Sequence, residues 1–113
     1  MAERMAEEYG TCPEDIIAST GPCICRDCFE VDEDLGAKFA AEFAQEGITR
    51  PGNPGKAYVD LELAAAVQFI EAGIRPENIT LMNACTYEDR AMFFSHRRDK
   101  GITGSMAAFI KLI

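Results

Sequence analysis

The sequence predicts an α/β fold in which a mixed sheet packs against two or three helices. Two short apolar runs rich in β-branched residues, 15–20 and 79–85, are typical of strands. Apolar residues recur with helical spacing after Asp32 and again after Asp60, and either aspartate can cap the helix that follows it. The 113 residues are enough for a single domain with a modest core.

The first half of the chain is expected to run helix, strand, loop, helix. Residues 2–9 are expected to form the last turns of a helix, with Gly10 as a left-handed cap. The strand at 15–20 ends at Gly21-Pro22, and a cysteine-containing loop follows. The next helix begins at Asp32 and places Leu35, Phe39 and Phe43 on one face.

The second half repeats this alternation. Residues 45–56 contain two prolines and three glycines and are expected to be a loop. A helix capped by Asp60 follows, with Leu63, Val67 and Ile70 on one face, and then the strand at 79–85. Residues 92–96 are a further short apolar stretch, and residues 106–113, apolar on nearly both faces, are expected to be a buried strand.

The two halves contain similar helix-to-strand turns. Residues 8–16 and, 63 positions later, residues 71–79 each place a glycine at a helix end, then a proline, and then a polar step into an apolar run. Common turn chemistry explains this likeness more simply than duplication does. Under either explanation, each copy predicts a helix, a tight turn and a strand.

Three of the five cysteines lie in one loop, and two interpretations of them are open. Cys25 and Cys28 have the Cys-x-x-Cys spacing of zinc sites, Cys23 offers a third thiol, and Cys12, Cys85 or His96 would complete a tetrahedron. However, structural zinc sites normally show two spaced pairs. The favoured interpretation is therefore that Cys23, Cys25 and Cys28 are small packing residues and that the chain binds no metal through them.

Composition excludes several classes of function. The net charge of −8 argues against nucleic acid and anionic membranes as partners. We expect no signal peptide, and no apolar run in these residues is long enough to span a bilayer. An odd number of cysteines without a secretory signal indicates free thiols in a reducing cytoplasm.

Ordered motifs along the chain resemble the laccase-domain family. They are Gly-Pro-Cys-Ile at 21–24, Cys-Phe-Glu-Val at 28–31, Tyr-Val-Asp-Leu at 58–61, Cys-Thr at 85–86, Phe-Ser-His-Arg-Arg-Asp at 94–99 and Thr-Gly at 103–104. The family was once described as multicopper polyphenol oxidoreductases. The resemblance implies a zinc-dependent purine nucleoside phosphorylase with adenosine deaminase activity, and a fold that is one half of a layered α/β sandwich.

The resemblance covers the C-terminal part of such a protein, so residues 1–113 are expected to be a single partial domain. It implies that the metal ligands, two histidines and a cysteine, belong to Asp-Cys and Ala-His-Ala-Gly-Trp-Arg-Gly segments. The second segment does not occur in this sequence, which has one histidine and no tryptophan, and its one Asp-Cys pair, at 27–28, overlaps the later Cys-Phe-Glu-Val motif. We therefore expect no catalytic residue and no zinc or copper cofactor in this chain alone, and His96 stands where the family usually has tyrosine.

Substrate contacts are expected from Ser95, Arg97 and Arg98, because a fork of guanidinium donors suits phosphate or a ribose-bound oxyanion. The alternative is that the arginine pair forms salt bridges with Asp99, Glu88 or Asp89. An arginine that the family usually has after Thr-Gly is replaced by Ser105.

Three functions follow as expectations. The first is membership of the phosphorylase family, acting on purine nucleosides and phosphate but inactive alone. The second is a non-catalytic module that associates with itself or with a complementary N-terminal half, and the third is a small cysteine-zinc domain. An apolar terminal strand and a helix without an N-terminal cap both favour association.

Overall fold

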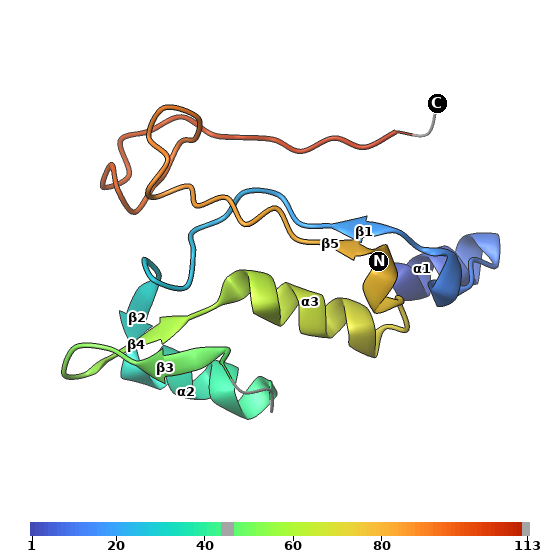
Figure 1. Cartoon of the computed structure of the whole chain (residues 1–113), viewed down its shortest axis with the longest axis horizontal. Helices are drawn as coiled ribbons and strands as arrows, with labels where there is room; N and C mark the ends of the chain where they lie inside the picture. Colours follow the sequence, from blue (N-terminus) through green and yellow to red (C-terminus); the bar gives the residue numbers. More distant parts are fainter. Residues whose placement is uncertain (44–46, 112–113) are drawn as a thin grey trace.

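The computed structural model describes residues 1–43 and 47–111, which contain three α-helices, two 3₁₀ turns and two small sheets joined by irregular segments (Figure 1). The predicted α/β class is confirmed, with parallel and antiparallel pairing divided between the two sheets. The elements in chain order are α1 (Ala2–Tyr9), η1 (Pro13–Asp15), β1 (Ala18–Ser19), β2 (Glu30–Asp32), α2 (Glu33–Glu42), β3 (Thr49–Pro51), β4 (Lys56–Val59), α3 (Leu61–Glu71), η2 (Pro76–Asn78) and β5 (Ile79–Thr80).

The antiparallel sheet has the order β2-β4-β3, and α2 packs on it. Close packing is possible because Gly36 is buried against β4, where an added Cβ would lie 2.6 Å from the Cβ of Ala57. The prediction that the Asp32 side chain caps α2 is wrong. Asp32 stands at the N-cap position, but its carboxylate pairs with Lys56 of the neighbouring strand (2.6 Å) and makes no side-chain capping hydrogen bond.

The parallel sheet joins the two similar turns of the sequence. Gly10 and Gly73 both have positive φ, the 3₁₀ turns η1 and η2 follow, and β1 pairs with β5 in the register Ala18↔Ile79. The turns also touch, because the Asn78 side chain donates to the Glu14 carbonyl at 3.3 Å. The expected helix, turn and strand of each half are thus confirmed, and the strands lie side by side (Figure 1).

The strands expected at 15–20 and 79–85 are shorter than predicted. After β1 and β5, hydrogen bonds from side chains take the place of backbone pairing between the two segments. The Glu62 carboxylate of α3 accepts hydrogen bonds from the Thr20 hydroxyl (2.7 Å) and the Asn83 N–H (3.3 Å), while Thr20 Oγ1 accepts from the Met82 N–H (2.9 Å). Asn83 has a φ of 56°, which interrupts the strand. Pairing resumes in one parallel bridge, Cys23↔Cys85.

Two other element predictions need correction. Part of the expected loop at 45–56 forms β3, which accepts Pro51 because it is an edge strand; residues 45 and 46 lie outside the described residues. Residues 106–111 form no strand. They run as an exposed, extended segment without ladder pairing (Figure 1), and Phe109 and Ile110 are 94% and 98% exposed. Residues 112 and 113 lie outside the described part.

The core lies between the two longer helices. Three residues are buried together: Phe43 directly after α2, Ile48 before β3, and Ala64 in α3. The partly buried residues that pack around them are Phe39, Leu63 and Val67. The predicted cap of α3 is confirmed, because the Asp60 carboxylate accepts the Leu63 N–H at 3.0 Å. Ile70, predicted on the same face, is instead 51% exposed. Among the described residues, no helix is long and apolar enough to cross a membrane.

Truncating Ile48 tests this core. Ile48 is 1% exposed, so Ile48→Ala should lower the free energy of unfolding by about 2–4 kcal/mol through lost apolar burial and a new cavity. Urea unfolding monitored by circular dichroism measures the change. Ile70→Ala is the matched control and should change the value by no more than about 0.5 kcal/mol, since the side chain is half exposed. Equal losses in the two variants would contradict this placement of the core.

Candidate functional site

The cysteine loop is fixed to the segment after β5 by backbone pairing. The Cys23 N–H donates to the Ala84 carbonyl, and the Thr86 N–H donates to the Cys23 carbonyl, both at 3.2 Å. The chain then turns sharply, since the N–H groups of Cys28 and Phe29 both donate to the Cys25 carbonyl at 3.0 Å. This turn brings the thiols of Cys25 and Cys28 to 3.5 Å from each other.

Four side chains converge here in what we call the cysteine–glutamate cluster: Cys25, Cys28, Cys85 and Glu88. Their sulfur and carboxylate oxygen atoms all lie within 4.8 Å of one another. Glu88 Oε1 is 3.3 Å from the Cys28 sulfur and 3.8 Å from the Cys25 sulfur. Cys85 is buried, Cys25 and Cys28 are half-buried and Glu88 is exposed, so the cluster opens to solvent on its carboxylate side.

The cluster makes its thiols unequal. Burial raises the pKa of Cys28 well above its ordinary value, and its hydrogen bonds with Cys25 and Glu88 raise it further. Burial and contact with Cys85 also raise the pKa of Cys25. Burial acts in the same direction on Cys85, but the N–H groups of Cys25, Glu88 and Tyr87 stabilise its thiolate and lower its pKa overall. Cys85 is therefore the first of the three thiols to ionise.

The sequence predicted part of this cluster. Cys25 and Cys28 come together as the Cys-x-x-Cys spacing predicts, whereas Cys23 lies outside the four residues and lines a pocket with Cys25, Asp60 and Glu62. Cys85, one of the suggested completing ligands, takes the third position, and neither Cys12 nor His96 belongs to the cluster. Sequence reasoning named Glu88 only as a salt-bridge partner for the arginine pair and missed its place beside the cysteines. The signal was present: Cys85-x-x-Glu88 repeats the spacing of Cys25-x-x-Cys28 with a carboxylate in place of the second thiol.

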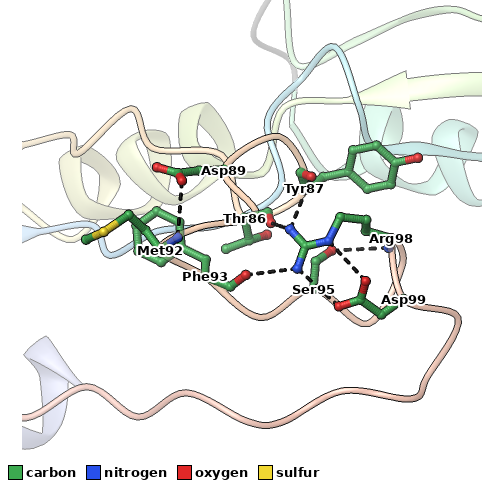
Figure 2. Close-up of polar contacts among 8 residues, drawn as sticks. All are labelled: Thr86, Tyr87, Asp89, Met92, Phe93, Ser95, Arg98 and Asp99. Carbon is green, nitrogen blue, oxygen red and sulfur yellow. Dashed lines mark hydrogen bonds and ion pairs between the residues drawn. The ribbon is translucent and has the colours of Figure 1, made fainter.

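Arg98 organises the segment that follows the cluster (Figure 2). Its Nη1 donates to the carbonyls of Thr86 (3.0 Å) and Tyr87 (3.4 Å), and its Nη2 donates to the Phe93 carbonyl (3.0 Å). Nε and Nη2 also form a forked ion pair with both carboxylate oxygens of Asp99, each at 3.1 Å. All five guanidinium N–H groups are thus engaged within the chain.

This contact changes the acidity of both partners. The forked hydrogen bonds raise the pKa of Arg98 and hold the pKa of Asp99 below its ordinary value. The geometry favours the interpretation in which Arg98 pairs with Asp99, rather than the one in which it receives a phosphate. Ser95 belongs to the same turn: it is buried, and its Oγ accepts the Arg98 N–H at 3.2 Å.

Arg97 faces a different environment. Its guanidinium lies 5.4 Å from the centre of the Phe29 ring, and Nη1 donates to the Glu30 carbonyl at 2.8 Å. It lines a pocket of about 290 Å³ together with Ile24, Phe29, Thr86, Phe94, Ser95 and His96. Two of the three predicted substrate contacts, Ser95 and Arg97, therefore border one pocket. Its walls come from the cysteine loop and the segment stabilised by Arg98.

Comparison with known proteins identifies the family of this chain. The sequence pattern of the family described as "Multi-copper polyphenol oxidoreductase laccase" matches residues 1–113. The chain belongs to this family. This chain is 37% identical over 100 residues to "Purine nucleoside phosphorylase YlmD" of Geobacillus stearothermophilus. The match covers 87% of this chain and 36% of that protein.

Two further comparisons agree in extent. "Adenosine deaminase RL5", from an unknown prokaryotic organism, is 34% identical over 103 residues, which cover 87% of this chain and 39% of that protein. The crystal structure of YlmD from Geobacillus stearothermophilus superimposes with a TM-score of 0.82 at 33% identity, covering 92% of this chain and 39% of that one. The chain thus spans well under half the length of the relatives that it matches.

The metal that the laccase family name implies does not fit the pocket residues of this chain. The resemblance assigns that metal to two histidines and a cysteine, whereas this sequence has one histidine, and His96 is exposed on the pocket wall. The cysteine–glutamate cluster has a different composition, three thiols and one carboxylate without histidine. It is therefore a separate candidate site.

Proposed function

We propose that this chain forms the nucleoside-binding wall of a purine nucleoside phosphorylase. The proposed activity is phosphorolysis of adenosine, inosine, guanosine and methylthioadenosine, with adenosine deamination as a second reaction. The observation that supports it most is the pocket lined by Phe29, Phe94 and Arg97, in a chain whose relatives are named for these activities. We also propose a reducing cytoplasm as its location, a setting in which five free thiols are stable.

The pocket chemistry suits a nucleoside. Two phenyl rings offer faces on which a purine can stack. Arg97 uses one nitrogen in the hydrogen bond to Glu30, and its remaining N–H groups are available to a phosphate or ribose oxygen. The volume of about 290 Å³ is at the small end of the usual range for ligand pockets, roughly 300–1,000 Å³. The proposal assigns substrate contact to Arg97 and Ser95, and makes Arg98 a positioning residue that stabilises the pocket wall.

Catalysis should need residues outside this chain. In the family chemistry, zinc would supply activated water for deamination or orient the nucleoside for attack by phosphate. The histidines that would hold it are missing from these 113 residues. We therefore propose that the chain binds and orients the nucleoside but does not convert it.

Binding without turnover is the expected result for the isolated chain. Titration of ¹⁵N-labelled chain with inosine in phosphate buffer should shift the amide signals of Phe29, Phe94 and Arg97, while chromatography detects no hypoxanthine above a no-protein control. Arg97→Ala should weaken this binding about tenfold, the loss expected for one charge-assisted contact. Arg75→Ala, at an exposed arginine in η2's N-cap, should leave it unchanged. Hypoxanthine release, or shifts confined to other residues, would contradict the proposal.

A non-catalytic association module is the second candidate. Exposed apolar side chains in the C-terminal segment favour it, especially Phe109 and Ile110. The two functions are compatible if the association partner completes the pocket. They differ in what the isolated chain binds: a nucleoside in the first case, and another polypeptide in the second.

A further inference from the structure

We propose that Cys25, Cys28, Cys85 and Glu88 form a structural zinc site. A tetrahedral zinc with bonds of about 2.0–2.3 Å places its ligand atoms about 3.3–3.8 Å apart. The three separations among Cys25, Cys28 and Glu88 match this: 3.5 Å for Cys25 to Cys28, 3.3 Å for Cys28 to Glu88 and 3.8 Å for Cys25 to Glu88. Three of the ligand atoms are thus spaced as on one face of a zinc tetrahedron, and the Cys85 sulfur, within 4.8 Å of each of them, is near enough to become the fourth ligand after a small adjustment.

The backbone supports this arrangement from two directions. One pair of ligands is carried by the tight turn after Cys25, and the other pair lies on the segment after the parallel bridge, where the Asp89 N–H donates to the Cys85 carbonyl at 3.0 Å. The Cys25 N–H donates to the Cys85 sulfur at 3.3 Å, joining the pairs. Such N–H contacts orient metal-bound thiolates and limit the rearrangement needed for binding.

The ligand chemistry selects the metal. Three thiolates disfavour magnesium and calcium, which take oxygen ligands, while a four-coordinate set of sulfur with one carboxylate suits zinc. Because all four positions come from the protein, the site has no open position for water and would be structural rather than catalytic.

Zinc here would stabilise the pocket without entering it. The ligands Cys25 and Cys85 are 60 residues apart in sequence, and their neighbours Ile24 and Thr86 line the pocket next to Arg97. Metal binding would fasten the cysteine loop to the following segment and reduce the local opening of both. This inference rests on the cluster geometry and does not depend on the proposed function.

Metal analysis of the whole 113-residue chain tests the proposal. The chain, purified under reducing conditions without chelator, should contain about one zinc by plasma mass spectrometry. Replacing zinc with cobalt(II) should give thiolate charge-transfer absorption and the visible bands of a tetrahedral site. Zinc far below one per chain after addition of the metal in excess, with all thiols still reactive towards a thiol reagent, would overturn the proposal, as would oxidation of Cys25 and Cys28 to a disulfide with no metal uptake.

Matched variants separate this site from adventitious binding by thiols. The double change Cys25→Ser and Cys28→Ser should abolish cobalt binding, while Cys12→Ser and Cys23→Ser should retain it, because those thiols lie outside the cluster. Glu88→Cys should tighten binding and increase the charge-transfer intensity, because a fourth thiolate replaces the carboxylate. This gain does not depend on whether the serine variant folds. Equal loss in all cysteine variants, or weaker binding in Glu88→Cys, would overturn the assignment.

Discussion

Replacing Arg98 with alanine should open the segment between Thr86 and Ile102 while leaving the α2–α3 core folded. The guanidinium satisfies the carbonyls of Thr86, Tyr87 and Phe93, which have no strand or helix to pair with. Removing it leaves these acceptors without their partner and leaves Asp99 without its counter-charge. Amide hydrogen exchange in this segment should accelerate by about tenfold or more, because its opening depends on few apolar contacts.

The shape of the guanidinium, and not its charge alone, should decide the effect. Arg98→Lys retains one positive charge but cannot form the five divergent hydrogen bonds, so it should lose most of the protection. Arg75→Ala, at an exposed arginine, is the control and should leave exchange in residues 86–102 unchanged. Hydrogen exchange followed by mass spectrometry resolves the peptides. Full protection in Arg98→Lys would show that charge alone is sufficient and that the fork is dispensable.

The same contact sets a pH dependence. Because Arg98 lowers the pKa of Asp99 below its ordinary 3.8, the folded protein binds that proton less readily than the unfolded chain does. The stability from this pair is therefore fully present above about pH 4 and is lost as the pH falls through the lower folded value. Asp99→Asn should flatten the dependence of segment protection on pH in this acidic range.

Local chemistry predicted the elements whose causes lie within a few residues. Gly10 ends α1 in a left-handed conformation and Asp60 caps α3, as their positions indicated. The turns from Gly10 to Pro13 and from Gly73 to Pro76 were also predicted, because each is built from neighbouring residues, whereas the parallel pairing of the strands that follow them joins distant residues. By contrast, Asp32 was expected to cap α2 but pairs with Lys56, a partner 24 positions away.

Distant partners also explain what the sequence did not predict at the site. Glu88 joins the cluster because pairing of Cys23 with Cys85 brings the two spaced pairs together, and no local pattern contains that pairing. The sequence also did not predict the carbonyls of Thr86 and Phe93 as acceptors for Arg98, because they lie 12 and 5 positions away in the chain. The prediction of a buried strand near the C-terminus was wrong for a related reason. Hydrophobicity indicates that a segment can be buried, but burial requires a surface to cover it.

The exposed segment at 106–111 should cause this chain to associate with another polypeptide. The radius of gyration is 15.9 Å, whereas a compact chain of this length has about 13 Å. Ile102, Phe109 and Ile110 are between 89% and 98% exposed, and the backbone of residues 106–111 is unpaired. Apolar side chains beside free backbone groups favour the addition of another polypeptide. We propose that the partner of this exposed segment is the remainder of the family fold. Where that remainder is absent, the partner is a second copy of this chain.

Sedimentation at about 10 μM, above the dissociation constants of stable interfaces, should therefore give an average mass above the 12.4 kDa of one chain. Phe109→Ser combined with Ile110→Ser should shift the distribution to monomer, while Ile17→Ser, at a side chain 78% exposed next to β1, should not. Addition of the part of the Geobacillus stearothermophilus relative that lies outside the match should replace self-association with a one-to-one complex, because both partners then bury the same surface. A single monomer with a sharp cooperative melt, unaffected by the added polypeptide, would contradict the proposal and show that the exposed segment needs no partner.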